Sequence, residues 1–248
     1  MTPFLFVSDL DNTLVGDDQA LAELNHKLSQ HRQEYGTKIV YATGRSPVLY
    51  RELQQEKQLL QPDALIASVG TEIYLNGSED PDSTWSEKLS HGWNRDLILA
   101  TTAHFADLVL QPESEQRPFK VSFFLTQASA EQIIPQLQSL LQQQGLEIKL
   151  IYSTGQDLDI VPLHSDKGLA VQFLRSSWGV TLQTVVCGDS GNDIALFAVG
   201  ESRGIIVGNA SHELLQWHNA NLADYRYLAQ SVCAGGILEG LKHFGFLE

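Results

Sequence analysis

The stretch Asp9-Leu10-Asp11-Asn12-Thr13-Leu14 decides the fold, because it directly follows the apolar run Phe4-Leu5-Phe6-Val7. That short run predicts a single strand buried on both faces. Side chains alternate along an extended chain, so the carboxylates of Asp9 and Asp11 point to the same side. Two like charges at a buried strand repel each other and lose solvation, so they require a cation or a proton. The alternative is an Asx-turn that only closes the strand.

Length and composition limit the class of protein. The 248 residues allow one large domain or a core with a smaller partner, and 43% hydrophobic residues are typical of globular proteins. We find no apolar run near the roughly 18 residues of a membrane helix, and we expect no signal peptide. The only cysteines, Cys187 and Cys233, are too few for a disulfide framework and lack metal-site spacing, which favours a cytoplasmic protein.

The formal net charge is −14 at pH 7, which argues against nucleic acid or an anionic membrane as a partner. The same charge repels an anionic substrate at long range. Any phosphate site must therefore concentrate positive charge locally, through lysine, a metal ion or oriented backbone N–H groups.

Strand-like and helix-like segments alternate at both ends of the chain, which is typical of βαβ units in an open parallel sheet. The N-terminal part predicts strands at 4–7, 38–42 and 64–67, with helices from about residue 18 and from Ser46-Pro47 to about 57. The C-terminal part predicts helices at 167–176, 194–199 and 236–244 and strands at 184–187 and 205–207.

The pattern changes between these two parts. After a polar linker at 76–83, the sequence predicts a long helical run from Trp85 through Phe105, a strand at 119–125, a helix, and a strand pair at 147–153 and 158–161. We expect a small α+β unit over residues 81–161, inserted into a core made of residues 1–80 and 162–248.

The start of the helix in the middle of that unit stays open. Ser129 with Gln132 fits a capping box, but Pro135 sits badly inside a helix that begins there. Either the helix is kinked or it begins near Pro135.

An open parallel sheet binds its ligands at the carboxyl ends of its strands, and four polar clusters fall at or just beyond such ends. Each alone has a plain interpretation as a turn, a loop or a surface lysine. Together they suit phosphoryl transfer, because carboxylates hold Mg²⁺ while a hydroxyl, glycine N–H groups and a lysine hold phosphate oxygens. One carboxylate remains as a nucleophile and another as a general acid. The clusters are Asp9/Asp11, Thr43-Gly44, Lys167 and Asp189/Asp193.

These clusters resemble the four motifs of the haloacid dehalogenase-like phosphatase superfamily, and the inserted unit resembles its C2-type cap. The closest resemblance is to the sucrose-phosphate phosphatases of cyanobacteria and plants. It implies an α/β fold: a Rossmann-like parallel-sheet core with helices on both faces, plus an inserted α+β cap. The stretches that carry it are residues 8–13, 41–46, 69–74, 118–122 and 187–193.

The resemblance also implies a Mg²⁺-dependent sugar phosphatase that hydrolyses sucrose-6-phosphate, the last step of sucrose biosynthesis. Asp9 would be the nucleophile that forms an aspartyl-phosphate, and Asp11 the general acid and then base. Mg²⁺ would be held by the Asp9 carboxylate, the backbone carbonyl of Asp11 and Asp189. Asp193 would complete this metal cluster by orienting Lys167 or a metal-bound water.

The remaining site residues divide between phosphate and sugar. Expected phosphate-binding residues are Thr43, Gly44, Lys167 and Asn192. For the sugar, the first candidate is Lys120, followed by Glu72 and Asp157, each of which has a solvated surface residue as its alternative.

Three alternatives stay open. The first is a phosphatase for another sugar phosphate, such as mannosyl-phosphoglycerate or trehalose-phosphate, which only the cap would distinguish. The second is a non-catalytic regulatory module, although such a module should have lost the paired aspartates. The third is a phosphomutase, which shares the aspartyl-phosphate step. We expect a monomer, with sucrose-phosphate synthase as a candidate partner.

Overall fold

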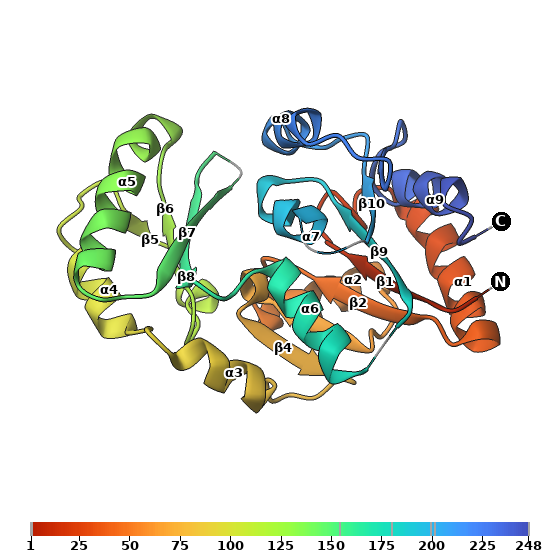
Figure 1. Cartoon of the computed structure of the whole chain (residues 1–248), viewed down its shortest axis with the longest axis horizontal. Helices are drawn as coiled ribbons and strands as arrows, with labels where there is room; N and C mark the ends of the chain where they lie inside the picture. Colours follow the sequence, from red (N-terminus) through yellow and green to blue (C-terminus); the bar gives the residue numbers. More distant parts are fainter. Residues whose placement is uncertain (1, 154, 180, 199, 201, 248) are drawn as a thin grey trace.

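The computed structural model describes residues 2–153, 155–179, 181–198, 200 and 202–247. Its larger sheet has seven strands in the order β11-β10-β9-β1-β2-β3-β4 (Figure 1). Neighbouring strands are parallel except β3 and β4, which are antiparallel. The strands are β1 (Phe4–Ser8), β2 (Lys38–Ala42), β3 (Ala64–Ala67), β4 (Glu72–Leu75), β9 (Gln183–Gly188), β10 (Arg203–Ile206) and β11 (Arg226–Leu228).

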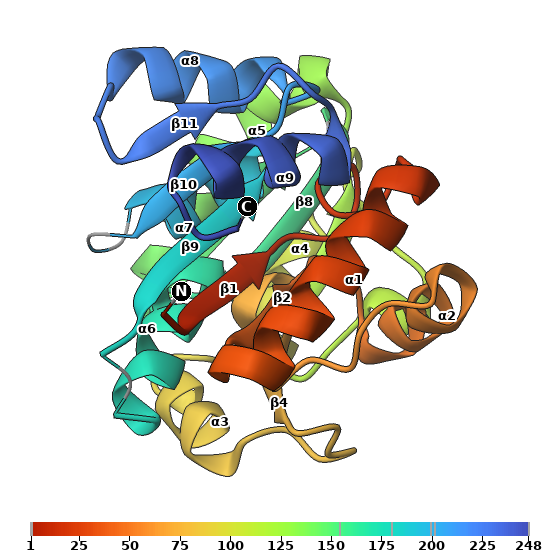
Figure 2. The ribbon, with the colours of Figure 1, turned by 90° about the vertical axis from the view of Figure 1, so that its right-hand side faces the viewer.

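Strand β1 shows why helices cover both faces of this sheet. Phe4 and Phe6 belong to one buried cluster, and Leu5 and Val7 belong to another, as alternation along a strand requires. The first cluster includes α1 (Asp18–Tyr35), α2 (Pro47–Lys57) and α9 (Cys233–His243), and α1 and α9 lie side by side (Figure 2). The second includes α3 (Ser83–Ser90), α6 (Lys167–Ser177), α7 (Ile194–Ala198) and α8 (His212–Ala220). The predicted α/β core is confirmed.

The middle of the chain forms a second, antiparallel sheet in the order β5-β6-β8-β7, beside the core (Figure 1). Helices α4 and α5 pack on it and share its hydrophobic cluster. We call this sheet with α4 and α5 the inserted unit. Its elements are α4 (Arg95–Thr102), β5 (Val109–Leu110), β6 (Val121–Phe124), α5 (Gln127–Gln143), β7 (Ile148–Ser153) and β8 (Asp157–Pro162).

The long helical run predicted from Trp85 through Phe105 is wrong, because α3 and α4 are separate helices. Helix α3 ends where His91 adopts an extended conformation (φ −66°, ψ 129°), and Gly92 follows it with a left-handed φ of +65°. Asn94 then caps α4 with its side chain. Trp85 of α3 is buried in the core cluster, so α3 covers the large sheet although it lies within residues 81–161.

Helix α5 begins earlier than either sequence-based alternative placed it. Thr126 is its N-cap, with its hydroxyl accepting from the backbone N–H of Ser129. The predicted capping box at Ser129 is therefore wrong, and the Ser129 hydroxyl donates instead to Oδ1 of Asp107 at 3.1 Å. Pro135 lies inside the continuous helix.

Short 3₁₀ segments connect several elements and carry parts of the site. They are η1 (Ser68–Gly70), η2 (Glu113–Glu115) and η3 (Gly191–Asp193). Within the described part of the chain, no helix combines the length and the apolar character needed to cross a bilayer. Cys187 and Cys233 are both buried and unpaired.

Candidate active site

Asp9 lies at the centre of the carboxyl edge of the core sheet. It directly follows β1, which pairs with β2 on one side and β9 on the other. Its backbone N–H donates to the carbonyl of Cys187 at 3.0 Å, which continues the β1–β9 ladder into the site. The side chain is buried, with 5% of the residue exposed. A buried ladder thus holds this carboxylate in one position.

Lys167 is the cation that faces Asp9. Asp166 caps the N-terminus of α6, which makes Lys167 the first residue of that helix. Its Nζ lies 2.7 Å from Oδ1 of Asp9, of Asn192 and of Asp193. Burial opposes the charge, but the carboxylates of Asp193 and Asp9 hold the pKa of Lys167 above its ordinary value. These contacts outweigh the unfavourable position of a cation at a helix N-terminus.

The loop after β9 brings two more carboxylates to the site. Oδ2 of Asp193 accepts the backbone N–H groups of Asp189 at 3.0 Å and Ser190 at 3.1 Å. The Thr13 hydroxyl donates to Oδ1 of Asp189 at 2.9 Å. Gly188 permits this turn, because a Cβ there would lie 2.5 Å from Cβ of Asp193. Burial, followed by the charge of Asp193, raises the pKa of Asp189 to about 7.

The carboxylates of Asp9, Asp189 and Asp193 form a cluster that fits a metal ion. Each offers one oxygen, and these oxygens lie within 4.8 Å of one another. Burial and the charge of Asp193 raise the pKa of Asp9, while Lys167 lowers it. Three buried carboxylates around one lysine leave negative charge to neutralise, and all-oxygen ligands suit a hard divalent cation.

The members of this cluster differ in access. Asp9 and Asp189 line the cavity, whereas Asp193 is completely buried. Both Asp193 oxygens are engaged by Lys167 and by backbone N–H groups. The contacts of Asp193 therefore fit the expected orienting role.

Asp11 points into the cavity and pairs with Arg45. The guanidinium donates from Nε to Oδ2 at 2.8 Å and from Nη2 to Oδ1 at 2.7 Å. The Arg45 backbone N–H donates to the Thr43 hydroxyl at 3.1 Å. Gly44 lines the cavity, while Thr43 is fully buried behind it. The two expected phosphate-binding residues of this loop thus differ in access.

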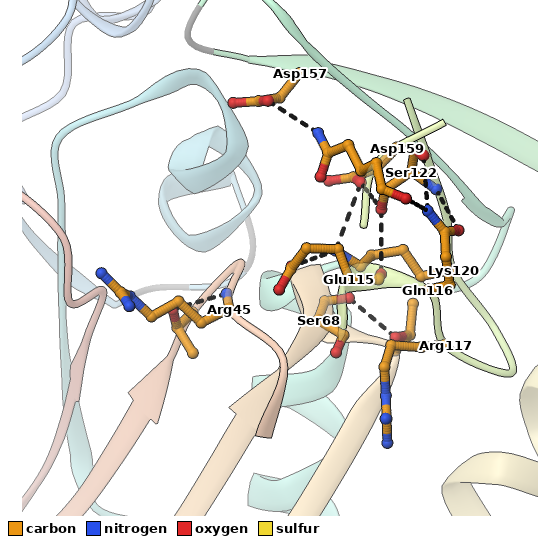
Figure 3. A network of polar contacts seen from close by, with 12 residues as sticks. Arg45, Ser68, Glu115, Gln116, Arg117, Lys120, Ser122, Asp157 and Asp159 are labelled. Carbon is orange, nitrogen blue, oxygen red and sulfur yellow. Dashed lines mark hydrogen bonds and ion pairs between the residues drawn. The ribbon is translucent and has the colours of Figure 1, made fainter. Parts of the chain in front are cut away.

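A cavity of about 320 Å³ lies between the core and the inserted unit. The core contributes the aspartates together with Gly44, Arg45 and Asn192. The opposite wall comes from the inserted unit, and we call its principal residues the polar shelf (Figure 3). The polar shelf consists of Gln111, Glu115, Lys120, Asp157 and Asp159.

Lys120 is the centre of the polar shelf and is only 2% exposed. Its Nζ lies 3.4 Å from Oε2 of Glu115 and 3.6 Å from Oδ1 of Asp159. Gln111 donates from Nε2 to Oδ1 of Asp157 at 2.9 Å. Charged and amide groups held in this way can bind sugar hydroxyls. Lys120 and Asp157, two of the expected sugar-binding residues, both line the cavity.

Glu72 lies elsewhere than the sugar-binding interpretation placed it. It is not among the described residues that line the cavity, and its carboxylate faces Arg117. Sequence reasoning missed Glu115, Gln111 and Asp159 as cavity residues. Only Asp159 had a signal, because it lies two residues after Asp157 and therefore on the same side of a strand.

The fold and the sequence match known phosphatases. The Sucrose-6F-phosphate phosphohydrolase family profile matches residues 2–245. Probable sucrose-phosphatase 2 of Arabidopsis thaliana is 41% identical over an alignment of 249 residues. The alignment covers 97% of this chain and 59% of that protein. This chain therefore spans about three fifths of the length of that relative.

Two further similarities extend over nearly the whole of both chains. The mannosylfructose-phosphate phosphatase of Agrobacterium fabrum is 31% identical over 242 residues, covering 97% of this chain and 96% of that protein. The crystal structure of the sucrose-phosphatase from Synechocystis sp. PCC6803, in complex with sucrose and phosphate, has a TM-score of 0.90. It is 42% identical, and the match covers 99% of both chains. The chain therefore belongs to the sucrose-6F-phosphate phosphohydrolase family, within the haloacid dehalogenase-like superfamily.

Proposed function

We propose that this chain hydrolyses sucrose-6-phosphate to sucrose and phosphate. The observation that carries the proposal is the pairing of a buried nucleophile with a polar wall across one cavity. Asp9, held by Lys167, lies on the core side, and Lys120 lies on the opposite side. The family supports the same substrate, and the Synechocystis relative was crystallised with both products of that reaction.

The two walls of the cavity suggest separate roles for the core and the inserted unit. Residues 1–80 and 162–248 form the catalytic core in this proposal, and residues 81–161 form the cap that selects the sugar. Because α3 packs on the core, relative motion of the two parts would occur after that helix.

The chemistry proceeds in two displacements. A carboxylate oxygen of Asp9 attacks phosphorus, and the sugar oxygen leaves with the proton that Asp11 donates. Asp11 then takes a proton from a water molecule whose oxygen attacks the same phosphorus, which breaks the acyl-phosphate bond and restores Asp9. The acid role requires Arg45 to release Asp11, since the guanidinium occupies both carboxylate oxygens.

The residues of the metal cluster fit Mg²⁺, which would neutralise charge on the transferring phosphoryl group. The Asp9 carboxylate, the Asp11 backbone carbonyl and Asp189 would hold it. The Nζ of Lys167 lies 2.7 Å from both Asp9 and Asp193. Asp193 thereby keeps Lys167 directed at Asp9.

The phosphoryl oxygens need donors beside the metal cluster. Lys167, the Gly44 N–H and the Asn192 amide would supply them, with the Thr43 hydroxyl behind. On the opposite wall, Lys120 and Asp157 would bind the sugar hydroxyls.

Phosphate release from a panel of sugar phosphates with Mg²⁺ tests this function. The panel contains sucrose-6-phosphate, mannosylfructose-phosphate and the 6-phosphates of trehalose, glucose and fructose. We expect a preference for sucrose-6-phosphate of about a hundredfold in kcat/KM, or roughly 2.7 kcal/mol. A preference for mannosylfructose-phosphate would support the second candidate substrate, which the Agrobacterium relative motivates. No turnover of any compound would contradict the enzyme and favour the regulatory module.

A further inference from the structure

The core and the inserted unit are joined by an ion pair between Glu72 and Arg117. Arg117 donates from Nε to both carboxylate oxygens, at 3.1 and 3.0 Å, and from Nη2 to Oε1 at 2.9 Å. Glu72 is only 4% exposed. The Arg117 side chain is 27% exposed, so the pair joins a buried carboxylate to a partly exposed guanidinium. A two-pronged pair of this kind fixes both distance and orientation between the groups it joins.

On the inserted unit, Arg117 is bonded directly to the polar shelf. Its backbone N–H donates to the carbonyl of Lys120 at 3.0 Å, and the N–H of Lys120 donates back at 3.2 Å. The indole N–H of Trp93 supports the same turn by donating to the carbonyl of Pro118 at 2.8 Å. Any shift of Arg117 therefore carries Lys120 with it.

On the core, Glu72 is bonded to the loop beside the phosphoryl site. The Ser68 hydroxyl donates to Oε2 of Glu72 at 3.0 Å, as part of the network in Figure 3. The N–H of Ser68 donates to the carbonyl of Arg45 at 2.9 Å, and the N–H of Val69 donates to the carbonyl of Thr43 at 3.1 Å. Ser68 and Val69 have φ of +54° and +60°, left-handed values that a non-glycine residue keeps only when its surroundings hold it.

We infer that Glu72 and Arg117 are positioning residues that, while their ion pair is intact, hold the polar shelf at a fixed distance from the phosphoryl-binding loop. The inference rests on the proposed function and names a structural source of the enzyme's substrate specificity. A substrate that contacts both walls of the cavity benefits from that fixed distance, because its phosphate and its sugar are bound at once. A small aryl phosphate that uses only the core gains nothing from it.

Arg117→Met removes the pair while keeping the length of the side chain. We expect the KM for sucrose-6-phosphate to rise by about tenfold or more, with kcat/KM for para-nitrophenyl phosphate within about threefold of wild type. Arg32→Met is the matched control, because Arg32 pairs with Asp63 at 3.1 Å on the core, outside the residues that line the cavity. Equal losses on both substrates, or an unchanged KM in the folded variant, would overturn the inference.

Arg117→Met leaves a buried carboxylate without its cation, and the variant then risks unfolding. The double variant Glu72→Gln/Arg117→Met removes that charge as well. We expect it to fold and to show the same rise in KM as the single variant, because the two side chains act as one pair. A double variant with wild-type KM would show that the pair does not position the polar shelf.

Hydrogen–deuterium exchange separates this inference from the proposed substrate, because it needs no turnover. We expect amides in residues 115–124 to exchange about tenfold faster in the double variant than in wild type or Arg32→Met. Unchanged exchange there would overturn the positioning role, even if sucrose-6-phosphate is hydrolysed. Faster exchange in a protein that does not hydrolyse sucrose-6-phosphate would retain the positioning role and reject the substrate.

Discussion

Lys167 places its Nζ 2.7 Å from Oδ1 of Asp193, and both side chains are completely buried. The other oxygen of Asp193 accepts the backbone N–H groups of Asp189 and Ser190. One carboxylate therefore joins the lysine at the start of α6 to the loop that carries Asp189. The orientation of the cation and the position of a candidate metal ligand depend on the same side chain.

Asp193→Asn is expected to damage both stability and activity. It removes one of the two carboxylates that pair with the buried Lys167 and leaves only Asp9 opposite that charge. Loss of one partner of a buried pair costs about 3–5 kcal/mol. We expect the free energy of unfolding to fall by about 3 kcal/mol and kcat by at least about a hundredfold, measured by urea denaturation and phosphate release. Asp18→Asn is the matched control, because Asp18 pairs with Lys57 at an exposed site, where solvent screening makes the loss of an ion pair small. Equal effects of the two substitutions would contradict the central role of Asp193.

The sequence allowed most of the core to be predicted, because its strands are apolar on both faces and alternate with amphipathic helices. Three elements of the core were not predicted: strand β4, helix α8 and strand β11. Helix α8 buries only Leu214 and His218, so it shows little apolar periodicity. Strand β11 has three residues and lies at the edge of the sheet. Its side chains are not buried, so its sequence shows little of the apolar pattern that predicts a strand.

The candidate site likewise has a part that the sequence predicts and a part that it does not. Residues at the ends of parallel strands meet because the topology brings those ends to one edge, and Asp9 and Asp189 do so. The contacts of the inserted unit depend on how two units pack, which local sequence does not encode. Glu72 and Arg117 are 45 residues apart in the sequence, and nothing local to either residue specifies the other.

Asp9→Asn tests the nucleophile. An amide cannot form the acyl-phosphate, so we expect kcat to fall by at least about a thousandfold. The fold should persist, because the substitution removes a charge that burial disfavours. Phosphate release and thermal unfolding together check both statements, and activity above a few per cent of wild type would remove Asp9 from this role.

Removal of the metal tests the cluster of buried carboxylates. Dialysis against EDTA should abolish turnover, and added Mg²⁺ should restore it, since the phosphoryl charge otherwise remains unneutralised. Asp189→Asn should require about tenfold more Mg²⁺ for half-maximal activity, because a neutral amide is a weaker ligand than a carboxylate. Full activity after dialysis, or an unchanged Mg²⁺ requirement in the variant, would exclude this cluster as the metal site.

Glu239, which lies away from the candidate active site, is expected to make a pH-dependent contribution to the stability of the fold. The Tyr227 hydroxyl and the N–H groups of Gln230 and Ser231 donate to its carboxylate, and chiefly the Tyr227 bond lowers the pKa of Glu239 to about 2. The folded state thus favours the ionised form. Its contribution is complete above the usual pKa of 4.5 and is lost as the pH falls toward 2.

Glu239→Gln should therefore lower the free energy of unfolding at pH 7 by about 1 kcal/mol, a value reduced for solvent screening at a partly exposed group. The difference from wild type should shrink between pH 4.5 and about 2. Urea denaturation across this range measures it, with Glu79→Gln at an exposed position as the control. A difference that stays constant with pH would rule out an ionised Glu239 as its source.

Lys120→Met tests the polar shelf itself. The substitution keeps the aliphatic stem but removes the ammonium group that lies between Glu115 and Asp159. We expect kcat/KM for sucrose-6-phosphate to fall by about a hundredfold, because the sugar loses a charged donor and two carboxylates lose their cation. Turnover of para-nitrophenyl phosphate should fall by less than about threefold, since that substrate reaches only the core. Lys242→Met, at an exposed position in the last turn of α9, controls for the loss of one positive charge. If both substrates lose activity equally, Lys120 supports the fold of the inserted unit and does not recognise the sugar.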